Sequence, residues 1–436
     1  MPQIGPLNSI LRVVIAAVAA FPACGQSTGN DPIRTPNDPP ATTADTPLAI
    51  VGVRVISMTT NIILDNQTVL VRDGAITAIG AAPTIDVPSG STVIDGAGRY
   101  LMPALIDMHV HLSSSQDLEK YVSSGIGTVR NMWAHGSIAG WQRDIAAGTR
   151  VGPTIVSASP GIDSPPAQWP GTLLVTDARQ VRAIVQAQAA AGWPYIKVYT
   201  RLTTEMFDSV MVAAKDAGIP ALGHVPFNVD IRHALESGMK SIEHFTGYDR
   251  AVSRTGRGGT TGWIDADPAR YPSLVAATVA AGVWNCPTLA IYSELSKQHT
   301  SGEREAILRN RRAFVRTISQ AGGKLLVGTD AGIDIVVPGT SIHDELREFV
   351  AAGLTPFDAL RGATSSAAEF LGRSDLGRVV VGARADLLLL EANPLSNIEN
   401  SKRINGVVLG GAWRPVSFRA ESARSALEVE ESPTSE

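Results

Sequence analysis

The feature that most constrains the fold is an alternation of apolar, strand-like runs with alanine-rich helical patterns through the middle of the chain. Helical periodicity separates most of these runs, as in residues 178–193. Alternating strands and helices predict parallel βα units, and eight such units close into a (β/α)8 barrel. An open, doubly wound sheet is the alternative, but no glycine-rich phosphate-binding motif follows the first run. The eight candidate strands are 104–112, 127–132, 153–159, 195–200, 220–225, 241–245, 283–289 and 324–329.

Two β-rich segments flank this middle region. The first contains alternating apolar runs, and Asp73-Gly74 between two of them is a strong hairpin signal. A similar pattern returns near the end of the chain. We predict an α/β protein in which residues 47–103 and 376–420 pair into a small composite β-sandwich, with the TIM barrel, residues 104–375, inserted between them.

The two ends of the chain read differently from the middle. Residues 1–24 hold an apolar run that is too short to span a bilayer and that resembles a secretory signal peptide. Cys24 follows small residues as in a bacterial lipoprotein signal, and an ordinary cleaved signal is the alternative. Residues 25–46 predict a disordered linker and 421–436 a disordered tail. We therefore expect an exported bacterial protein, either periplasmic or anchored to the membrane through a lipidated Cys24.

Charge and cysteine content exclude some functions. Lys and Arg number 37 against 41 Asp and Glu, so no basic excess exists for a general nucleic-acid binder. The hydrophobic fraction of 44% suits a large packed core. With only two cysteines, Cys24 and Cys286, a stabilising intramolecular disulfide is not expected. Cys286 lies in an apolar run and is predicted to be a small buried hydrophobe.

The sequence DMHVHL, residues 107–112, ends the first barrel run. Side chains alternate along a strand, so His109 and His111 point to the same face. A buried imidazole must be hydrogen-bonded, ionised or ligated. Other strand-like runs of the barrel carry titratable residues at or near their ends. These are Lys197, His224, His244 and Asp330.

In a barrel of this type the carboxyl ends of the strands build the active site. Taken singly, each polar residue has a structural explanation, such as an ion-paired lysine or an aspartate that caps a helix. Together they predict a metal site, because imidazole and carboxylate are good ligands for zinc and similar divalent ions. The small-molecule substrate of such a site is not identified by the sequence, and neither is the oligomeric state.

The chain resembles the amidohydrolase superfamily, in its imidazolonepropionase-like and metal-dependent prolidase-like branch. The resemblance covers nearly the whole mature chain and rests on VIDGAGRYLMPALIDMHVHL, YIKVYT, LGHV, SIEHF, GTDAG and GRVVVGARADLLLLEANPL, among other segments. It implies a (β/α)8 barrel with a composite β-sandwich and two divalent metal ions, most often zinc. The implied ligands are His109, His111 and Asp330 for the more buried ion, His224 and His244 for the second, and a carbamylated Lys197 as the bridge.

The sequence departs from the family pattern at two points. Pro103-Ala104-Leu105 replaces the usual Pro-Gly-Leu before the first strand. The residues after Lys197 are VYTRLT, where peptidase members often carry a glycine-rich segment. The second departure puts a peptidase activity in question and leaves the metal ligands unaffected.

The expected reaction is hydrolysis of an amide or peptide-like C–N bond by a metal-activated hydroxide. Asp330 is the expected general base and then acid. Tyr199, two residues after Lys197, is expected to line the pocket, and Tyr248 to bind a substrate oxyanion. Both lie close to strand ends.

Residues 246–272 are glycine-rich and lack periodicity, so they are a candidate lid. Three arginines within them, Arg250, Arg254 and Arg257, are candidates for binding a substrate carboxylate. His135 and His343 are weaker site candidates.

Three alternatives stay open at the level of the sequence. The same binuclear site serves a lactonase or a phosphotriesterase. A secreted metal- or solute-binding protein without catalysis would carry the same ligands, although a degenerate copy should have lost some of them. A surface protein whose histidines only satisfy the core is the third alternative.

Overall fold

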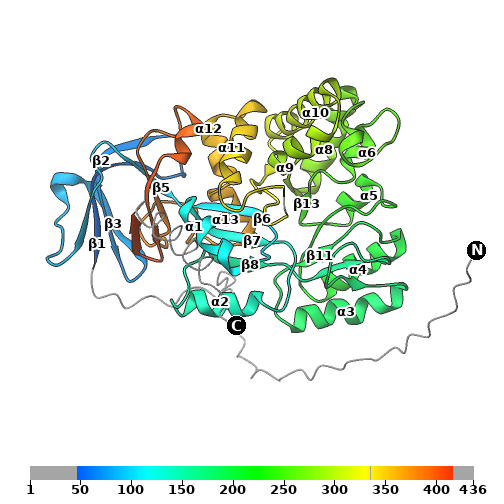
Figure 1. Ribbon diagram of the computed structural model, residues 1–436, viewed down its shortest axis with the longest axis horizontal. Helices are drawn as coiled ribbons and strands as arrows, with labels where there is room; N and C mark the ends of the chain where they lie inside the picture. The colour runs from blue at the N-terminus through cyan, green and yellow to red at the C-terminus, as the bar shows by residue number, and fades with distance from the viewer. Residues whose placement is uncertain (1–46, 334, 416–436) are drawn as a thin grey trace, which may run out of the picture. The chain divides into compact units, whose positions relative to one another are not determined.

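The computed structural model describes residues 47–333 and 335–415. The predicted signal peptide, Cys24, the linker and the tail lie outside the described residues. Within the described ranges, no helix combines the length and the apolar character needed to cross a membrane. Figure 1 shows a β-rich part formed by both ends of the described chain and a βα part formed by its middle.

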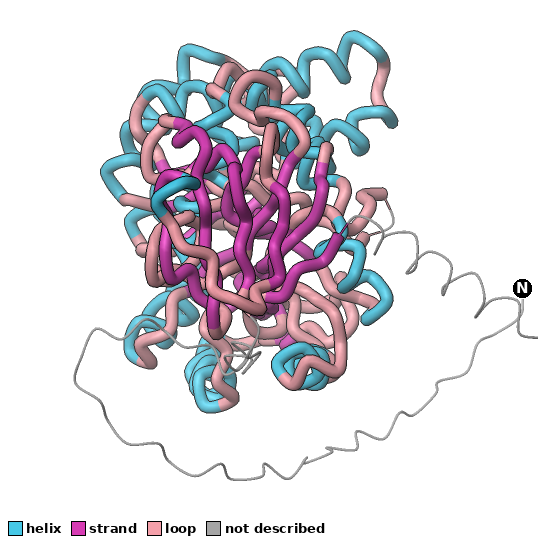
Figure 2. Tube along the Cα trace, turned by 90° about the vertical axis from the view of Figure 1, so that its left-hand side faces the viewer, coloured by secondary structure: helices cyan, strands magenta, loops and turns pink. Residues whose placement is uncertain are grey.

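The β-rich part is one sheet, whose strands lie side by side in Figure 2. These strands come from both ends of the described chain. Their order is β18-β17-β16-β5-β1-β2-β3, and β4 pairs with β1. The strands are β1 (Leu48–Ile56), β2 (Ile63–Arg72), β3 (Ala75–Ala81), β4 (Thr92–Asp95), β5 (Tyr100–Pro103), β16 (Leu387–Leu390), β17 (Ile404–Leu409) and β18 (Ala412–Pro415).

Backbone hydrogen bonds explain how this sheet encloses its own core. Asp73 and Gly74 have φ of 51° and 76° and turn β2 into β3, which confirms the predicted hairpin. The Ile76 amide donates to the Ala383 carbonyl at 2.8 Å, so the start of β3 meets the chain just before β16. All four leucines of β16 are buried. The β-sandwich is thus a single continuous sheet that folds over an apolar interior.

Short parallel strands form the βα part, and each of the eight predicted ranges overlaps one of them. Two additional strands, β9 (Gly161–Asp163) and β10 (Leu173–Leu174), follow the third. The eight are β6 (Leu105–Val110), β7 (Ile126–Asn131), β8 (Thr154–Ser157), β11 (Ile196–Val198), β12 (Ala221–Gly223), β13 (Ser241–Glu243), β14 (Trp284–Cys286) and β15 (Lys324–Leu325).

Two sets of hydrogen bonds close these strands into a ring. The Ser159 amide donates to the Tyr195 carbonyl at 2.9 Å and joins the end of β8 to the start of β11. On the opposite side, Met108 donates to Val327 at 3.0 Å and Asp330 donates to His109 at 2.8 Å. The last strand segment therefore pairs with the first, and the predicted (β/α)8 barrel is confirmed.

Helices alternate with the barrel strands and surround them (Figure 1). Asp177, Thr203 and Asp230 cap the helices α3, α4 and α5 through hydrogen bonds to backbone amides, and α3 lies within the helical pattern of residues 178–193. The helices are α1 (Leu118–Ser123), α2 (Ile138–Ala146), α3 (Ala178–Ala190), α4 (Thr204–Asp216), α5 (Ile231–Glu236), α6 (Tyr248–Val252), α7 (Gly259–Gly262), α8 (Tyr271–Ala281), α9 (Leu289–Leu295), α10 (Ser301–Gln320), α11 (Ser341–Ala351), α12 (Pro356–Gly362) and α13 (Ser365–Leu371).

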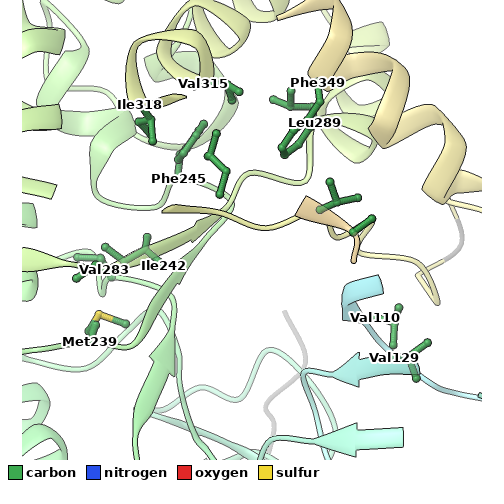
Figure 3. Packing of buried hydrophobic residues seen from close by; sticks show 14 of the residues in the cluster. Val110, Val129, Met239, Ile242, Phe245, Val283, Leu289, Val315, Ile318 and Phe349 are labelled. Atoms are coloured by element: carbon green, nitrogen blue, oxygen red, sulfur yellow. The ribbon is translucent and has the colours of Figure 1, made fainter. Parts of the chain in front are cut away.

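The main core lies between the barrel strands and these helices. Figure 3 shows Val315 and Ile318 of α10 beside Phe245, and Phe349 of α11 beside Leu289. Phe314 of α10 packs against four aromatic rings whose centroids lie within 5.6 Å of its own. This packing fixes the loops that follow β13 and β14, both of which contribute to the site.

The candidate lid at residues 246–272 is a packed part of the outer layer. It folds into α6, α7 and a short 3-10 turn, and Trp263 within it is fully buried. The Asn310 side chain donates to the Trp263 carbonyl at 2.7 Å, and Gly259 donates to Asp249 at 2.6 Å. These bonds tie the segment to α10 and to itself, so it is ordered and packed in this structure, and the lid role stays a prediction.

Candidate metal centre

Three of the predicted ligands converge at the carboxyl ends of β6 and β15. The Nε2 atoms of His109 and His111 lie 3.3 Å apart, and each lies 3.2 Å from Asp330 Oδ1. His109 of β6 and His111 just after it lie on the same inner side, as predicted from the alternation in DMHVHL. Two imidazole nitrogens and a carboxylate oxygen therefore point at one small volume.

The other three predicted ligands complete the cluster from β11, β12 and β13. The His244 ring lies 4.5 Å from the His109 ring and 4.9 Å from the His224 ring, centroid to centroid. Lys197 is fully buried in β11 and interacts electrostatically with Asp330 and His224. The structure thus brings all six predicted ligands together.

The backbone is strained where it presents some of these side chains. His244 and Asp330 have φ of 61° and 63°, and Thr288 after β14 has φ of 49°. Residues other than glycine rarely adopt this left-handed conformation, and each instance costs on the order of 1–3 kcal/mol. Surrounding contacts must hold these residues in place: the Thr288 hydroxyl lies 2.7 Å from His244 Nδ1, and Arg311 donates to the His244 carbonyl at 3.1 Å.

A buried carboxylate behind the cluster orients His109, and the sequence analysis missed it. Glu243 of β13 accepts a hydrogen bond from His109 Nδ1 at 2.8 Å. It also forms an ion pair with Arg130 of β7 at 2.9 Å. All three side chains are fully buried. With Nδ1 committed to Glu243, the Nε2 of His109 is left to face the cluster, which is the arrangement metal-binding histidines adopt.

A second buried carboxylate fixes the loop that carries Asp330. Asp107 accepts hydrogen bonds from the Thr329 amide at 3.0 Å and the Thr329 hydroxyl at 2.7 Å. Burial raises the pKa of Asp107 to about 6, against the lowering effect of these bonds. Asp107 begins the DMHVHL sequence, so its role was detectable as a buried acid in an apolar strand.

Burial sets the protonation of the cluster. It lowers the pKa of His111, of His224 and of His244, the last to about 3, so these rings are neutral near pH 7. Burial alone would raise the pKa of Asp330, but His244 and His109 outweigh it and the pKa falls well below its usual range. The result is a set of neutral imidazoles around an ionised carboxylate, the protonation state in which these groups bind metal.

These residues fit divalent transition metals. The donor atoms of His109, His111 and Asp330 lie within 4.8 Å of one another. Nitrogen and oxygen donors of this kind suit zinc and similar ions. His224 Nδ1 and Lys197 Nζ are buried without a hydrogen-bond partner among the described residues, although unpartnered buried polar atoms are costly.

The two tyrosines predicted to contact substrate differ in their positions. Tyr199 is half-buried beside the cluster, with its ring 4.4 Å from the His224 ring. Tyr248 is fully buried, and its hydroxyl lies 2.8 Å from the Thr278 hydroxyl in α8. The prediction for Tyr248 is wrong, because the chain leaves the strand direction after His244 and turns Tyr248 into the outer aromatic core. Tyr292, whose ring lies 6.4 Å from the His244 ring, was not predicted.

Two of the three candidate arginines in the segment 246–272 bind protein groups through their side chains. Arg250 donates to the Pro226 carbonyl at 2.9 Å, and Arg254 lies 3.6 Å from Asp267. Arg257 is exposed, and its amide donates to the Ser253 hydroxyl at 3.1 Å. None of these contacts involves the cluster.

The surroundings of two further histidines and of Cys286 indicate structural roles. His135 Nε2 lies 2.6 Å from the Leu112 carbonyl, and His343 Nδ1 lies 2.9 Å from the Ser401 hydroxyl. Cys286 is a buried free thiol whose pKa is raised by burial, as expected of a small hydrophobe.

The chain matches a known protein family and several known proteins. The family model described as "Amidohydrolase family" matches residues 100–414. Over 356 residues the chain is 26% identical to adenine deaminase 2 of Rhizobium johnstonii, covering 76% of this chain and 52% of that protein. It is also 26% identical to the imidazolonepropionase of Mycolicibacterium smegmatis, covering 76% and 85% of the two chains. The chain thus spans about half the length of the adenine deaminase it matches.

Solved structures show the same fold. A putative prolidase from Bifidobacterium longum superposes with a TM-score of 0.70 at 24% identity, covering 87% of this chain and 99% of that one. A Xaa-Pro dipeptidase with bound methionine superposes with a TM-score of 0.69 at 21% identity, covering 85% and 100%. Because the family model spans well over half of its residues, the chain belongs to the amidohydrolase family.

Proposed function

We propose that this protein is a metal-dependent hydrolase that cleaves a C–N bond, amide or peptide-like, in a small substrate. The observation that carries the proposal is the convergence of four histidines, one aspartate and one buried lysine at the carboxyl ends of the barrel strands. Two relatives are named adenine deaminase and imidazolonepropionase, and both names are consistent with hydrolysis of a C–N bond.

We propose two divalent ions, with zinc the first candidate. His109, His111 and Asp330 would hold one, His224 and His244 the other. When bound, divalent ions supply Lewis-acid activation of water and of a substrate carbonyl. Glu243 keeps the His109 ring in the tautomer that leaves Nε2 free.

Lys197 would join the two halves of the site as a carbamate. Burial lowers its pKa to about 8, so a substantial fraction of the amine is neutral near physiological pH. The neutral nitrogen would attack carbon dioxide: an N–C bond forms while the π pair of one C=O bond moves to its oxygen, and the nitrogen then loses one proton to water. The product carries a carboxylate's charge and two oxygens, which suits a bridging ligand.

We propose Asp330 as the residue that moves protons. Its carboxylate is ionised and lies 3.2 Å from two imidazoles at the centre of the cluster. In the proposal it accepts a proton from the attacking water and passes it to the leaving nitrogen. Tyr199, beside His224, lines the substrate pocket.

We also propose that the protein is exported and acts in the periplasm or from a lipid anchor on Cys24. The support for this is the sequence of residues 1–24 alone. Mass determination of the mature N-terminus separates an acylated Cys24 from a cleaved, unmodified chain.

The first experiment is metal content after purification without chelator. We expect about two equivalents of zinc or a similar ion in the wild type, with losses in His109→Ala and Lys197→Ala. His233→Ala is the matched control, because His233 lies on α5 and pairs with Asp208 at 2.6 Å away from the cluster. A wild type free of metal and unaffected by added zinc contradicts the proposal.

The second experiment is a substrate panel of dipeptides, N-acyl amino acids, lactones and phosphotriesters. Hydrolysis of the amides supports the proposal, and activity confined to lactones or phosphotriesters replaces it. Asp330→Asn should lower kcat by about 10²–10⁴. Because the same change can weaken metal binding, metal content is measured on the same sample. An Asp330→Asn protein that keeps both metal and full activity refutes the proton-transfer role.

A further inference from the structure

Two large aromatic side chains are exposed in loops that follow barrel strands. Trp169, in the loop between β9 and β10, keeps 45% of its surface exposed, and Phe227, after β12, keeps 57%. Both loops follow the carboxyl ends of barrel strands, where the site lies. A single exposed apolar side chain needs no explanation, whereas exposed apolar side chains grouped at an active-site mouth can mark a binding surface.

Hydrogen bonds tie these two aromatics to the same stretch of chain. The indole N–H of Trp169 donates to the Tyr199 oxygen at 2.6 Å. The Phe227 amide donates to the Thr200 carbonyl at 2.8 Å, and Gln168 donates to the Thr200 hydroxyl at 3.0 Å. Trp169 and Phe227 therefore both attach to residues 199–200, at the end of the strand that carries Lys197.

Ring contacts connect this surface to the metal ligands. Trp133 packs edge-on against Tyr199 at 5.2 Å, and Tyr199 lies 4.4 Å from the His224 ring. A continuous aromatic path thus runs from exposed Trp169 through Tyr199 to a proposed metal ligand. The Tyr199 oxygen accepts from Trp169, so the tyrosine's own proton is free to be donated elsewhere.

We propose that the substrate carries an aromatic or large apolar group that packs against Trp169, beside Tyr199 and Phe227. The inference rests on the proposed hydrolytic function and names the substrate class of that site. Trp169 is the specificity-determining residue in this scheme. It selects the substrate through its ring face, and its N–H holds Tyr199.

Two matched substrate pairs test the inference. N-benzoylalanine against N-acetylalanine probes the acyl side, and glycylphenylalanine against glycylalanine probes the amine side. We expect the wild type to prefer the aromatic member of one pair. Trp169→Ala should reduce that preference, measured as the ratio of kcat/KM values, by about tenfold, the upper range for a single aromatic contact.

Two further variants separate recognition from structure. Trp169→Phe keeps a ring and loses the N–H, so it should retain most of the preference. Val212→Ala removes an exposed apolar side chain on α4 and should leave the ratio unchanged. An unchanged ratio in Trp169→Ala, or equal losses on both members of each pair, overturns the inference.

A binding measurement keeps this result separate from the proposed function. Saturation-transfer NMR on the metal-loaded protein reports contact with the N-benzoylalanine ring whether or not hydrolysis occurs. Ring saturation that is present in the wild type and lost in Trp169→Ala supports the inference even if no amide is cleaved, in which case only the proposed function fails. No ring saturation in the wild type overturns the inference.

Discussion

Glu243 allows the support of the site to be tested through protein stability. Its carboxylate lies 2.9 Å from Arg130 Nη2, and both side chains are fully buried. Removing one partner of a buried ion pair leaves an uncompensated charge and costs about 3–5 kcal/mol. Glu243→Gln keeps the volume and removes the charge, so we expect a loss in this range.

The loss can be converted to a melting temperature. The entropy of unfolding is about 0.8 kcal/mol per kelvin for a folded region of this size, so Tm should fall by about 4–6 °C. Burial opposes ionisation of Glu243, but Arg130 and the bond from His109 prevail and lower its pKa. The stabilisation is therefore fully present above the ordinary value of 4.5 and is lost as pH falls through the lower folded pKa.

Differential scanning calorimetry at pH 7, on metal-loaded and chelated protein, measures the effect. Asp216→Asn is the control, because it removes an exposed pair with Arg182 at 2.9 Å and should cost less than about 1 kcal/mol. The double variant Arg130→Met with Glu243→Gln should cost less than the sum of the single changes. Equal costs for Glu243→Gln and Asp216→Asn would refute the reasoning.

Three further predictions concern stability. The pKa of His244 falls from 6.5 to about 3 in the folded protein, so between these pH values protons bind to the unfolded chain and destabilise the fold. The Tm of the metal-stripped wild type should therefore approach that of His244→Asn as the pH is lowered from 7 to 5, and a constant Tm difference contradicts this. Phe314→Ala should cost about 3–5 kcal/mol in urea unfolding, since its buried ring packs against four others, and a loss below about 1 kcal/mol would show that the cavity collapses. In Gly161→Ala the new Cβ would lie 2.2 Å from the Trp133 ring and should cost about 1–3 kcal/mol, whereas Gly140→Ala, with no atom nearer than 3.9 Å, should be neutral or stabilising by thermal shift.

The sequence predicted the ligand cluster because the barrel imposes a simple rule. Strands that are parallel and buried end at one face, so His109, Lys197 and Asp330 could be grouped without knowledge of their distances. The alternation of side chains along the strand that carries His109 likewise predicted which way the His111 side chain points. These inferences need only the order of strands along the chain.

The misses arise where that rule stops. His244 and Phe245 have positive φ, which ends the strand geometry of β13. The direction of the Tyr248 side chain could therefore not be extrapolated from β13. Glu243 is visible in SIEHF, but its role depends on Arg130, which lies 113 residues away in the sequence. Trp169 lies in a loop without periodicity, and only its bond to Tyr199 reveals its place.

The seam that closes the barrel has a consequence for folding. Asp330 donates its amide to the His109 carbonyl, and Thr329 bonds to Asp107, so pairing at this seam joins segments 222 residues apart along the chain. Closing so long a loop carries a large entropic cost before any contact repays it. The first histidines therefore meet their aspartate only through a long-range pairing, and strands already formed between them shorten the loop that has to close. A nascent or nicked protein that lacks the last barrel strand also lacks Asp330 beside His109 and His111, so in the proposed metal site the capacity to bind metal would report that the ring is complete.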